Sequence, residues 1–203
     1  MSTTPPTNTP ATPRKSGLPG WAIAVLVATV AIPILLVILG VVSSLAIYGF
    51  RRYLAAAKSA EARASVARMA KDAATAYERE RVDGVTTETP VPSHRLCASA
   101  SKPVPASLDQ VSGRKYRSSP SEWQVDASRN AGFACLGFSM SDAQYYQYMY
   151  EMNGTGEDAS SFSAIAKGDL NGDGIASYFC VTGRVELGER VAIEPLVETL
   201  PEE

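Results

Sequence analysis

The segment that decides the fold is residues 46–63, AIYGFRRYLAAAKSAEAR. Before it, no charged side chain occurs between Lys15 and Arg51. After it, an alanine-rich pattern interspersed with charges continues to about Arg81, with no glycine or proline from Arg51 to Val82. Because alanine is the strongest helix former, this pattern predicts one uninterrupted helix that is apolar in its first half and polar in its second.

The first half is a run of uncharged, mostly apolar residues that begins at Trp21 and ends at Phe50. About 20 such residues in a helix cross the ~30 Å hydrocarbon core of a bilayer. A cleavable secretory signal has a shorter apolar stretch of roughly 7 to 15 residues. The run therefore predicts an uncleaved, single-pass transmembrane helix over residues 20–50, with the lipid bilayer as its partner.

Residues 1–19 precede this helix and are rich in threonine, proline and serine. Such a composition buries too little apolar surface to offset the entropy lost on ordering the chain. We expect this segment to be a disordered tail.

The second half of the helix, residues 51–82, carries apolar side chains three or four residues apart, which predicts one face to bury. Small side chains suit close packing, and we favour a covering sheet over a coiled-coil stalk because strands follow in the sequence. Arg68 and Asp72 are spaced to pair on the opposite face. The expected buried stripe consists of Tyr53, Ala57, Ala60, Ala64, Ala67, Ala70, Ala74 and Tyr77.

Residues 83–203 are predicted to form one globular domain. A long proline-rich loop, residues 83–132, comes first, with a short helix near Leu108. The period then changes to two, and we expect strands at 133–139, 145–150, 161–167, 177–183 and 190–194. Short intervening turns favour sequential hairpins, so the predicted fold is α+β, a long N-terminal helix packed on an antiparallel β-meander. The acidic residues 194–203 are expected to be a frayed tail.

The turn after the third expected strand carries a possible metal ligand set. Asp169, Asn171 and Asp173, followed by Gly174, match the opening of a calcium-binding loop. The twelfth position is Cys180 rather than the bidentate glutamate. We favour a metal-free hairpin turn, with calcium as the alternative.

No pattern in the chain indicates catalysis. It has neither a G-x-S-x-G nucleophile motif nor a glycine-rich phosphate loop, and His94, its one histidine, is expected to be a solvated loop residue. The net charge of -2 gives no basic field for nucleic acid. We therefore expect a non-enzymatic protein without a cofactor.

A tyrosine row alternates along the second expected strand at Tyr146, Tyr148 and Tyr150. Aromatic side chains favour strands because they pack across them, which makes a structural role the first interpretation. An exposed row contacting a glycan or a partner subunit is the alternative.

The three cysteines bear on the compartment. Cys97, Cys135 and Cys180 lie in the polar part of the chain and lack the C-x-x-C spacing of a zinc site. One disulfide in an oxidising compartment is plausible, with one thiol left over. The flanking charges give no clear orientation, because basic residues border both ends of the apolar run: Arg14 and Lys15 before it, and Arg51, Arg52 and Lys58 after it. The cysteines favour export of the domain.

The segment 46–63 resembles the point at which the first helix of type IV pilins leaves the membrane. There an Ala-Ile-Pro-Asn-Phe sequence is followed by an arginine and an aromatic residue, and then by lysine, Glu-Ala and a basic residue. Further stretches resemble pilin-like proteins of delta-proteobacterial lineages: residues 133–139 (FACLGFS), 143–150 (AQYYQYMY), 166–174 (AKGDLNGDG) and 177–179 (SYF), together with Leu96-Cys97, Pro103-Val104-Pro105, Tyr116 and Trp123.

This resemblance implies a pilin-like fold with the domain outside the cytoplasm. It also implies a disulfide between Cys97 and Cys135, because the resembling proteins carry cysteines in both contexts. Cys135 with Cys180, across neighbouring expected strands, is the alternative. The expected location is the inner membrane, with a periplasmic domain.

The resemblance fails at the processing site of prepilins. Aligning Tyr48 with the family proline places Leu26, Val27 and Ala31 where the family has the glycine, phenylalanine and glutamate needed for cleavage and filament register. Gly20-Trp21 is the nearest glycine-aromatic pair, with Val25 at the glutamate position.

We therefore expect an anchored pilin-like structural or interaction protein. The first alternative is a processed type IV pilin or type II secretion pseudopilin, assembled with like subunits in an extracellular filament. The second is a membrane-tethered adhesion or sensor module responsive to a glycan or calcium.

Overall fold

The computed structural model describes residues 19–79, 81–82, 92–154, 160–186 and 190–201. The predicted tail at residues 1–18 and the part of the loop at residues 83–91 lie outside the described residues. The chain divides into two units, one ending at Gly49 and the other beginning at Phe50.

The longest element is helix α1, Gly20–Glu78, which contains Pro33 in its first half. It ends four residues before the predicted boundary, because β1 (Arg81–Val82) pairs with β2 (Pro92–Ser93) in a small antiparallel ladder. The second half of α1, from Phe50 onward, belongs to the unit that contains the sheet.

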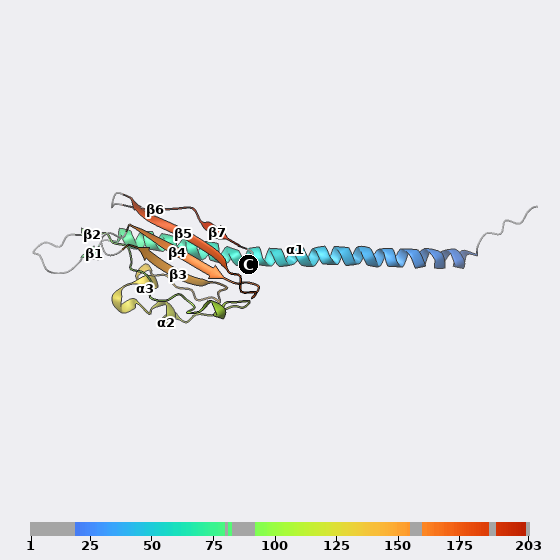
Figure 1. Cartoon of the computed structure of the whole chain (residues 1–203), viewed down its shortest axis with the longest axis horizontal. Coiled ribbons are helices and arrows are strands. Elements are labelled where there is room, and N and C mark those ends of the chain that lie inside the picture. Colours follow the sequence, from blue (N-terminus) through green and yellow to red (C-terminus); the bar gives the residue numbers. More distant parts are fainter. Residues whose placement is uncertain (1–18, 80, 83–91, 155–159, 187–189, 202–203) are drawn as a thin grey trace, which may run out of the picture. The chain divides into compact units, whose positions relative to one another are not determined.

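The sheet is antiparallel, as the sequence predicts, and it has five strands. The strands β3 (Gln147–Asn153), β4 (Ser161–Gly168), β5 (Ser177–Glu186) and β6 (Arg190–Ile193) follow one another in space as in sequence, and β7 (Val197–Thr199) also pairs with β5. They lie side by side along the second half of α1 (Figure 1). The fold is therefore α+β, a long helix packed on an antiparallel sheet.

Two predicted elements at the ends of this sheet are wrong. Residues 133–139 do not form a strand, because they lie in a short helix, α3 (Gly132–Leu136), that Gly137 ends with φ of 73°. A short apolar run fits a buried helix as well as a strand, so its period does not decide between them. The C-terminal segment is not a frayed tail, since β7 pairs with β5 and Glu198 accepts hydrogen bonds from Arg63 on α1 at 3.0 and 2.8 Å.

The proline-rich loop contains three short helices among its described residues, where the sequence predicts one. They are η1 (Leu108–Gln110), near the expected Leu108, α2 (Pro120–Trp123) and η2 (Ala127–Arg129). Trp123 is buried against Phe133 and Phe138, with ring centroids 5.0 and 5.4 Å apart. These contacts form an aromatic cluster beside α1.

The face of α1 that is buried differs from the predicted stripe. Tyr53, Ala57, Ala60 and Ala64 are exposed, Ala67 and Ala74 are half-buried, and only Ala70 and Tyr77 of the expected set are buried. Alanine occurs on every side of this segment, so its spacing alone does not define a face. The large side chains Val66 and Met69 define it, with buried neighbours Ser59, Ala62, Ala70, Ala73 and Ala76.

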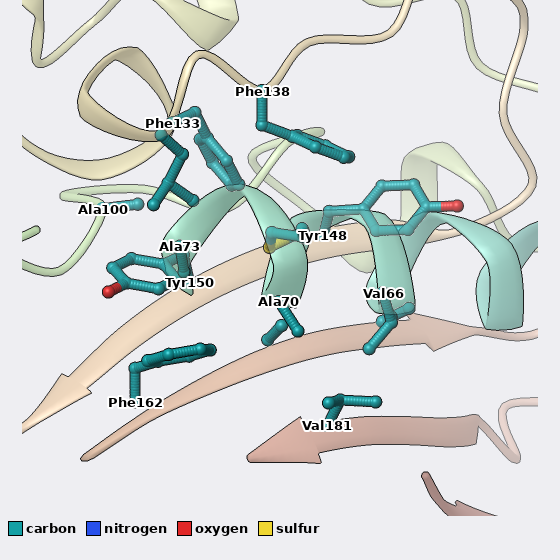
Figure 2. Close-up of a cluster of buried hydrophobic side chains, with 14 of the residues drawn as sticks. Val66, Ala70, Ala73, Ala100, Phe133, Phe138, Tyr148, Tyr150, Phe162 and Val181 are labelled. Carbon is teal, nitrogen blue, oxygen red and sulfur yellow. The ribbon is translucent and has the colours of Figure 1, made fainter. Parts of the chain in front are cut away.

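The core forms where this face meets the sheet. Figure 2 shows Val66, Ala70 and Ala73 on α1 close to aromatic and aliphatic side chains of the strands. On β3 and β4 the inward residues include Tyr148, Tyr150 and Phe162, all fully buried. Gly183 lies opposite Phe162 in register. A Cβ atom at position 183 would lie only 2.3 Å from the ring of Phe162, so a larger residue does not fit. The small helix residues and this glycine allow large rings to fill the interface.

Candidate functional site

The first half of α1 is apolar and exposed. By length and composition, α1 qualifies as a membrane-spanning helix, and it is the one such helix among the described residues. None of its most apolar 18-residue window is buried within the protein. Trp21, Val37 and Leu45 are 72%, 66% and 66% exposed. A contiguous apolar surface of this size marks a site of membrane or protein contact.

The second half of α1 carries a half-buried carboxylate, Glu61, at the interface with the sheet. Its Oε1 accepts a hydrogen bond from the backbone N–H of Tyr145 at 3.0 Å and another from the hydroxyl of Tyr148 at 3.1 Å. Burial raises the pKa of Glu61, and the two hydrogen bonds and the positive charge of Lys115 oppose that rise. Sequence analysis missed this group, because a glutamate in a charged alanine-rich helix is typical of a solvated face.

The tyrosine row belongs to the interior of the protein. Tyr146, Tyr148 and Tyr150 are all fully buried, as the structural interpretation requires, so the row presents no surface to a glycan. The hydroxyl of Tyr150 donates to the carbonyl oxygen of Cys97 at 3.2 Å. Burial raises the pKa of Tyr146 to about 12. The hydroxyls of Tyr148 and Tyr150 hold β3 to α1 and to the loop, respectively.

The Asp169 to Gly174 turn is held together by its own polar groups. The carboxylate of Asp169 accepts hydrogen bonds from the N–H groups of Gly172 and Gly174 at 2.7 and 3.1 Å and from the hydroxyl of Ser112 at 2.7 Å. Burial raises the pKa of this carboxyl, but the hydrogen bonds outweigh it and the pKa is lowered.

The other two members of the predicted calcium set also bond within the turn. Asn171 Oδ1 accepts from the N–H of Asp173 at 2.9 Å, and Asp173 Oδ1 accepts from the N–H of Ile175 at 2.8 Å. Gly172 and Gly174 have φ of 79° and 90°, values that glycine adopts without strain. The described residues contain no cluster of three or more histidine, cysteine, aspartate or glutamate side chains arranged to hold a metal ion. The polar side chains of this hairpin turn therefore form hydrogen bonds with backbone groups of the turn itself.

The cysteine pairing implied by the pilin resemblance is confirmed. Cys97 and Cys135 form a disulfide across 38 residues, with their Cα atoms 5.9 Å apart, so the alternative pair Cys135–Cys180 is wrong. Cys135 lies on α3 rather than on a strand. Cys180 is a free, half-buried thiol on β5, in register with Ile165 on one side and Val197 on the other.

His94 is exposed in the loop after β2, as predicted. Its Nδ1 lies 3.1 Å from the carbonyl oxygen of Tyr77, and its ring lies beside that of Tyr77 at 5.7 Å. This position anchors the loop to the end of α1.

The outer face of the sheet carries a shallow groove of about 260 Å³. Met149 and Ile165 are paired in register there, with Lys167 toward one end and Glu151 toward the other. This volume is below that of most small-molecule sites.

Comparison with protein-family models, with curated proteins and with solved structures finds no match for this chain. Any assignment of function therefore depends on the surfaces and contacts described above.

Proposed function

We propose that this protein is a single-pass membrane protein of the pilin-like kind, which serves a structural or interaction role rather than an enzymatic one. The observation that carries the proposal is the contrast within α1. Its first half is uncharged, apolar and exposed, whereas its second half has its apolar face covered by the sheet of the same chain. A lipid bilayer supplies the missing cover for the first half.

Two further observations support this role. A helix whose later half is covered by an antiparallel sheet is the architecture that the pilin resemblance implies. The disulfide between Cys97 and Cys135 fits an oxidising compartment, which favours a periplasmic domain over a cytoplasmic one.

Membrane fractionation tests the anchor. We expect the full chain, produced in a bacterial host, to remain in the membrane after an alkaline carbonate wash and to leave it in detergent. A variant with Leu36→Arg and Val37→Arg should be released into the soluble fraction, because each central arginine costs about 2.5 to 3.5 kcal/mol on insertion. Recovery of the unmodified chain in the carbonate supernatant would contradict the anchor.

Protease treatment of spheroplasts tests the compartment separately. A periplasmic domain is digested by protease added from outside, with a cytoplasmic protein as the protected control. A domain that survives until the cells are lysed lies in the cytoplasm, and the proposed orientation is then wrong.

A second candidate is a processed filament subunit, in which like apolar segments of other copies cover the first half of α1. Gly20 begins α1 and its surroundings are open, with no atom within 4 Å of a Cβ placed there. Intact mass of protein isolated from membranes separates the candidates. Retention of Met1 to Gly20 supports the anchor, and a mature chain that begins at Trp21 supports the filament subunit.

A further inference from the structure

The face of the sheet that points away from α1 carries an apolar row that crosses four strands. Its members pair in register, each with the next, from β3 through β4 and β5 to β7: Met149, Ile165, Cys180 and Val197. We call these four residues the outer row. Val197 is 60% exposed, Met149 and Cys180 are half-buried, and Ile165 lines the shallow groove. The outer row therefore offers an apolar surface on the side of the sheet that α1 does not cover.

Opposite charges lie on the two sides of the outer row. Lys167 follows Ile165 by two residues on β4, and Glu151 follows Met149 by two residues on β3, which runs in the opposite direction. Each charged residue is therefore about 7 Å from the row, at ~3.4 Å per residue. Both side chains are exposed, and the Nζ of Lys167 lies 5.7 Å from the ring centroid of Tyr178. In the part of the chain that the structure describes, neither charge belongs to an ion pair.

This pattern of charges is complementary to itself. A two-fold axis that lies parallel to the face and follows the outer row turns one copy over onto another and reverses its strand direction. The side with Lys167 in one copy then meets the side with Glu151 in the other, and the same contact occurs twice, as in isologous interfaces. Each apolar residue of the row meets its own counterpart, and the strands of the two sheets stay close to aligned, as in sheets that pack face to face.

A two-fold axis that runs along the strands fits this face less well. It brings the Lys167 sides of both copies together and the Glu151 sides together, so that like charges meet. Two further pairs of charged side chains near this face are already joined within the chain, Arg184 with Glu194 and Glu186 with Arg190. The charges therefore favour the axis that follows the outer row.

Cys180 lies in the outer row and is the free thiol left by the disulfide. A leftover cysteine in an exported domain indicates a contact between chains or a reactive thiol. Sheets that pack face to face are ~10 Å apart, whereas a disulfide needs Cα atoms at about 4.4 to 6.8 Å. We therefore expect the two Cys180 thiols to face each other across the axis without forming a disulfide.

We infer that the outer face of the sheet binds a second copy of this chain, with the two outer rows in contact and Lys167 of each copy beside Glu151 of the other. The contact involves only residues of the sheet-containing unit. The inference goes beyond the proposed membrane anchor and does not depend on it.

Sedimentation of the full chain in a non-ionic detergent tests the pairing. We expect a dimer at about 0.1 mM chain, a concentration at which an interface of micromolar affinity is filled. Lys167→Glu makes both charged positions negative and Glu151→Lys makes both positive, so each variant should raise the dissociation constant at least about tenfold. Lys71→Glu and Glu78→Lys reverse exposed charges on α1 and are the matched controls, which should dimerise like the unmodified chain.

Mixing the two variants separates lost pairing from lost folding. An equal mixture of Lys167→Glu and Glu151→Lys should form a mixed dimer, because every charge again meets an opposite one. A chain that carries both substitutions should dimerise with itself for the same reason. Failure of the mixture and of the doubly substituted chain to dimerise, while both single variants keep the near-UV circular dichroism of the unmodified chain, would contradict the proposed contact.

Crosslinking through Cys180 locates the contact on the chain. A short bis-maleimide reagent should join two unmodified copies, and it should also join the mixed pair. The single charge variants should give little product, and Cys180→Ser should give none. A dimer that is not joined through Cys180 and is unchanged by both charge reversals is held by another surface, and the inference is then wrong.

The remaining outcomes separate this inference from the proposed function. An unmodified chain that stays monomeric at about 0.1 mM overturns the pairing and leaves the anchor untouched. If the chain instead leaves the membrane in the carbonate wash but still dimerises with the expected charge dependence, the anchor is wrong and the pairing stands.

Discussion

The two halves of α1 have the same backbone geometry but different partners. The residues from Gly20 to Gly49 carry apolar side chains on every side, and nothing in the described chain buries them. The residues from Phe50 to Glu78 carry charges, and only the face with Val66 and Met69 is apolar and covered. A helix that is hydrophobic all round needs a surrounding apolar phase, whereas one with a single apolar face needs one covering layer. The distribution of side chains, and not helix formation, assigns each half its partner.

The same substitution should destabilise the sheet-containing unit when it is made in the second half of α1 but not when it is made in the first, and this difference is the largest effect that we predict. Val66→Asp places an unpaired carboxylate in the core, and we expect it to destabilise the sheet-containing unit by about 4 kcal/mol or more. Val37→Asp, at an exposed position, should leave that unit's stability unchanged. Urea unfolding of the full chain in detergent, followed by near-UV circular dichroism, measures both. Equal losses would contradict the division of α1 into two environments.

Removing the disulfide should weaken only the covered half. Cys97→Ser opens a link across 38 residues, and we expect a loss of about 2 to 4 kcal/mol in the unfolding free energy. Hydrogen exchange should rise in the second half of α1 and in the strands, while the first half stays protected in detergent. Cys180→Ser, which removes the free thiol, is the control and should change stability little.

The turn between β4 and β5 should behave as a structural element of the covered half. Asp169→Ala leaves the N–H groups of Gly172 and Gly174 and the hydroxyl of Ser112 without their acceptor, at a cost of about 1 to 3 kcal/mol. We expect the same loss in calcium and in chelator, as measured by thermal unfolding. A melting temperature that rises strongly with calcium and loses that rise in Asp169→Ala would restore the calcium-responsive alternative.

The smallest effect should be a change in pH dependence at Glu61. Because burial raises its pKa above the usual 4.5, the folded protein holds this proton more tightly than the unfolded chain. The resulting stabilisation is complete below pH 4.5 and is lost as pH rises through the folded-state pKa. Glu61→Gln removes this contribution, so stability should fall less as pH rises from 4.5 toward neutral. Measuring the unfolding free energy of Glu61→Gln and of the unmodified protein across this pH range checks the prediction. If the two free energies change in parallel with pH, Glu61 is not the titrating group.

Prediction from sequence succeeded where the signal was long or strongly periodic. The uncharged run beginning at Trp21 and the glycine-free helix after it fixed the longest element, and alternation fixed β4 and β5 nearly to their bounds. It failed at residues 133–139, where seven apolar and small residues fit either period, and at β7, whose acidic sequence gives no strand signal. The disulfide was implied by resemblance to pilins and not by spacing, which leaves three pairings open.

The sequence by itself determined that α1 is long, that its first half requires an apolar environment, and that an antiparallel sheet follows. These features are local, because they depend on composition and on the period of neighbouring residues. Only the tertiary structure decided which face of the alanine-rich half is buried, since that face is set by the fit of Tyr148, Phe162 and Val181 against small helix residues. It likewise brought Glu61 to Tyr148, and Lys58 and Lys115 to Tyr145, across separations that no local pattern encodes.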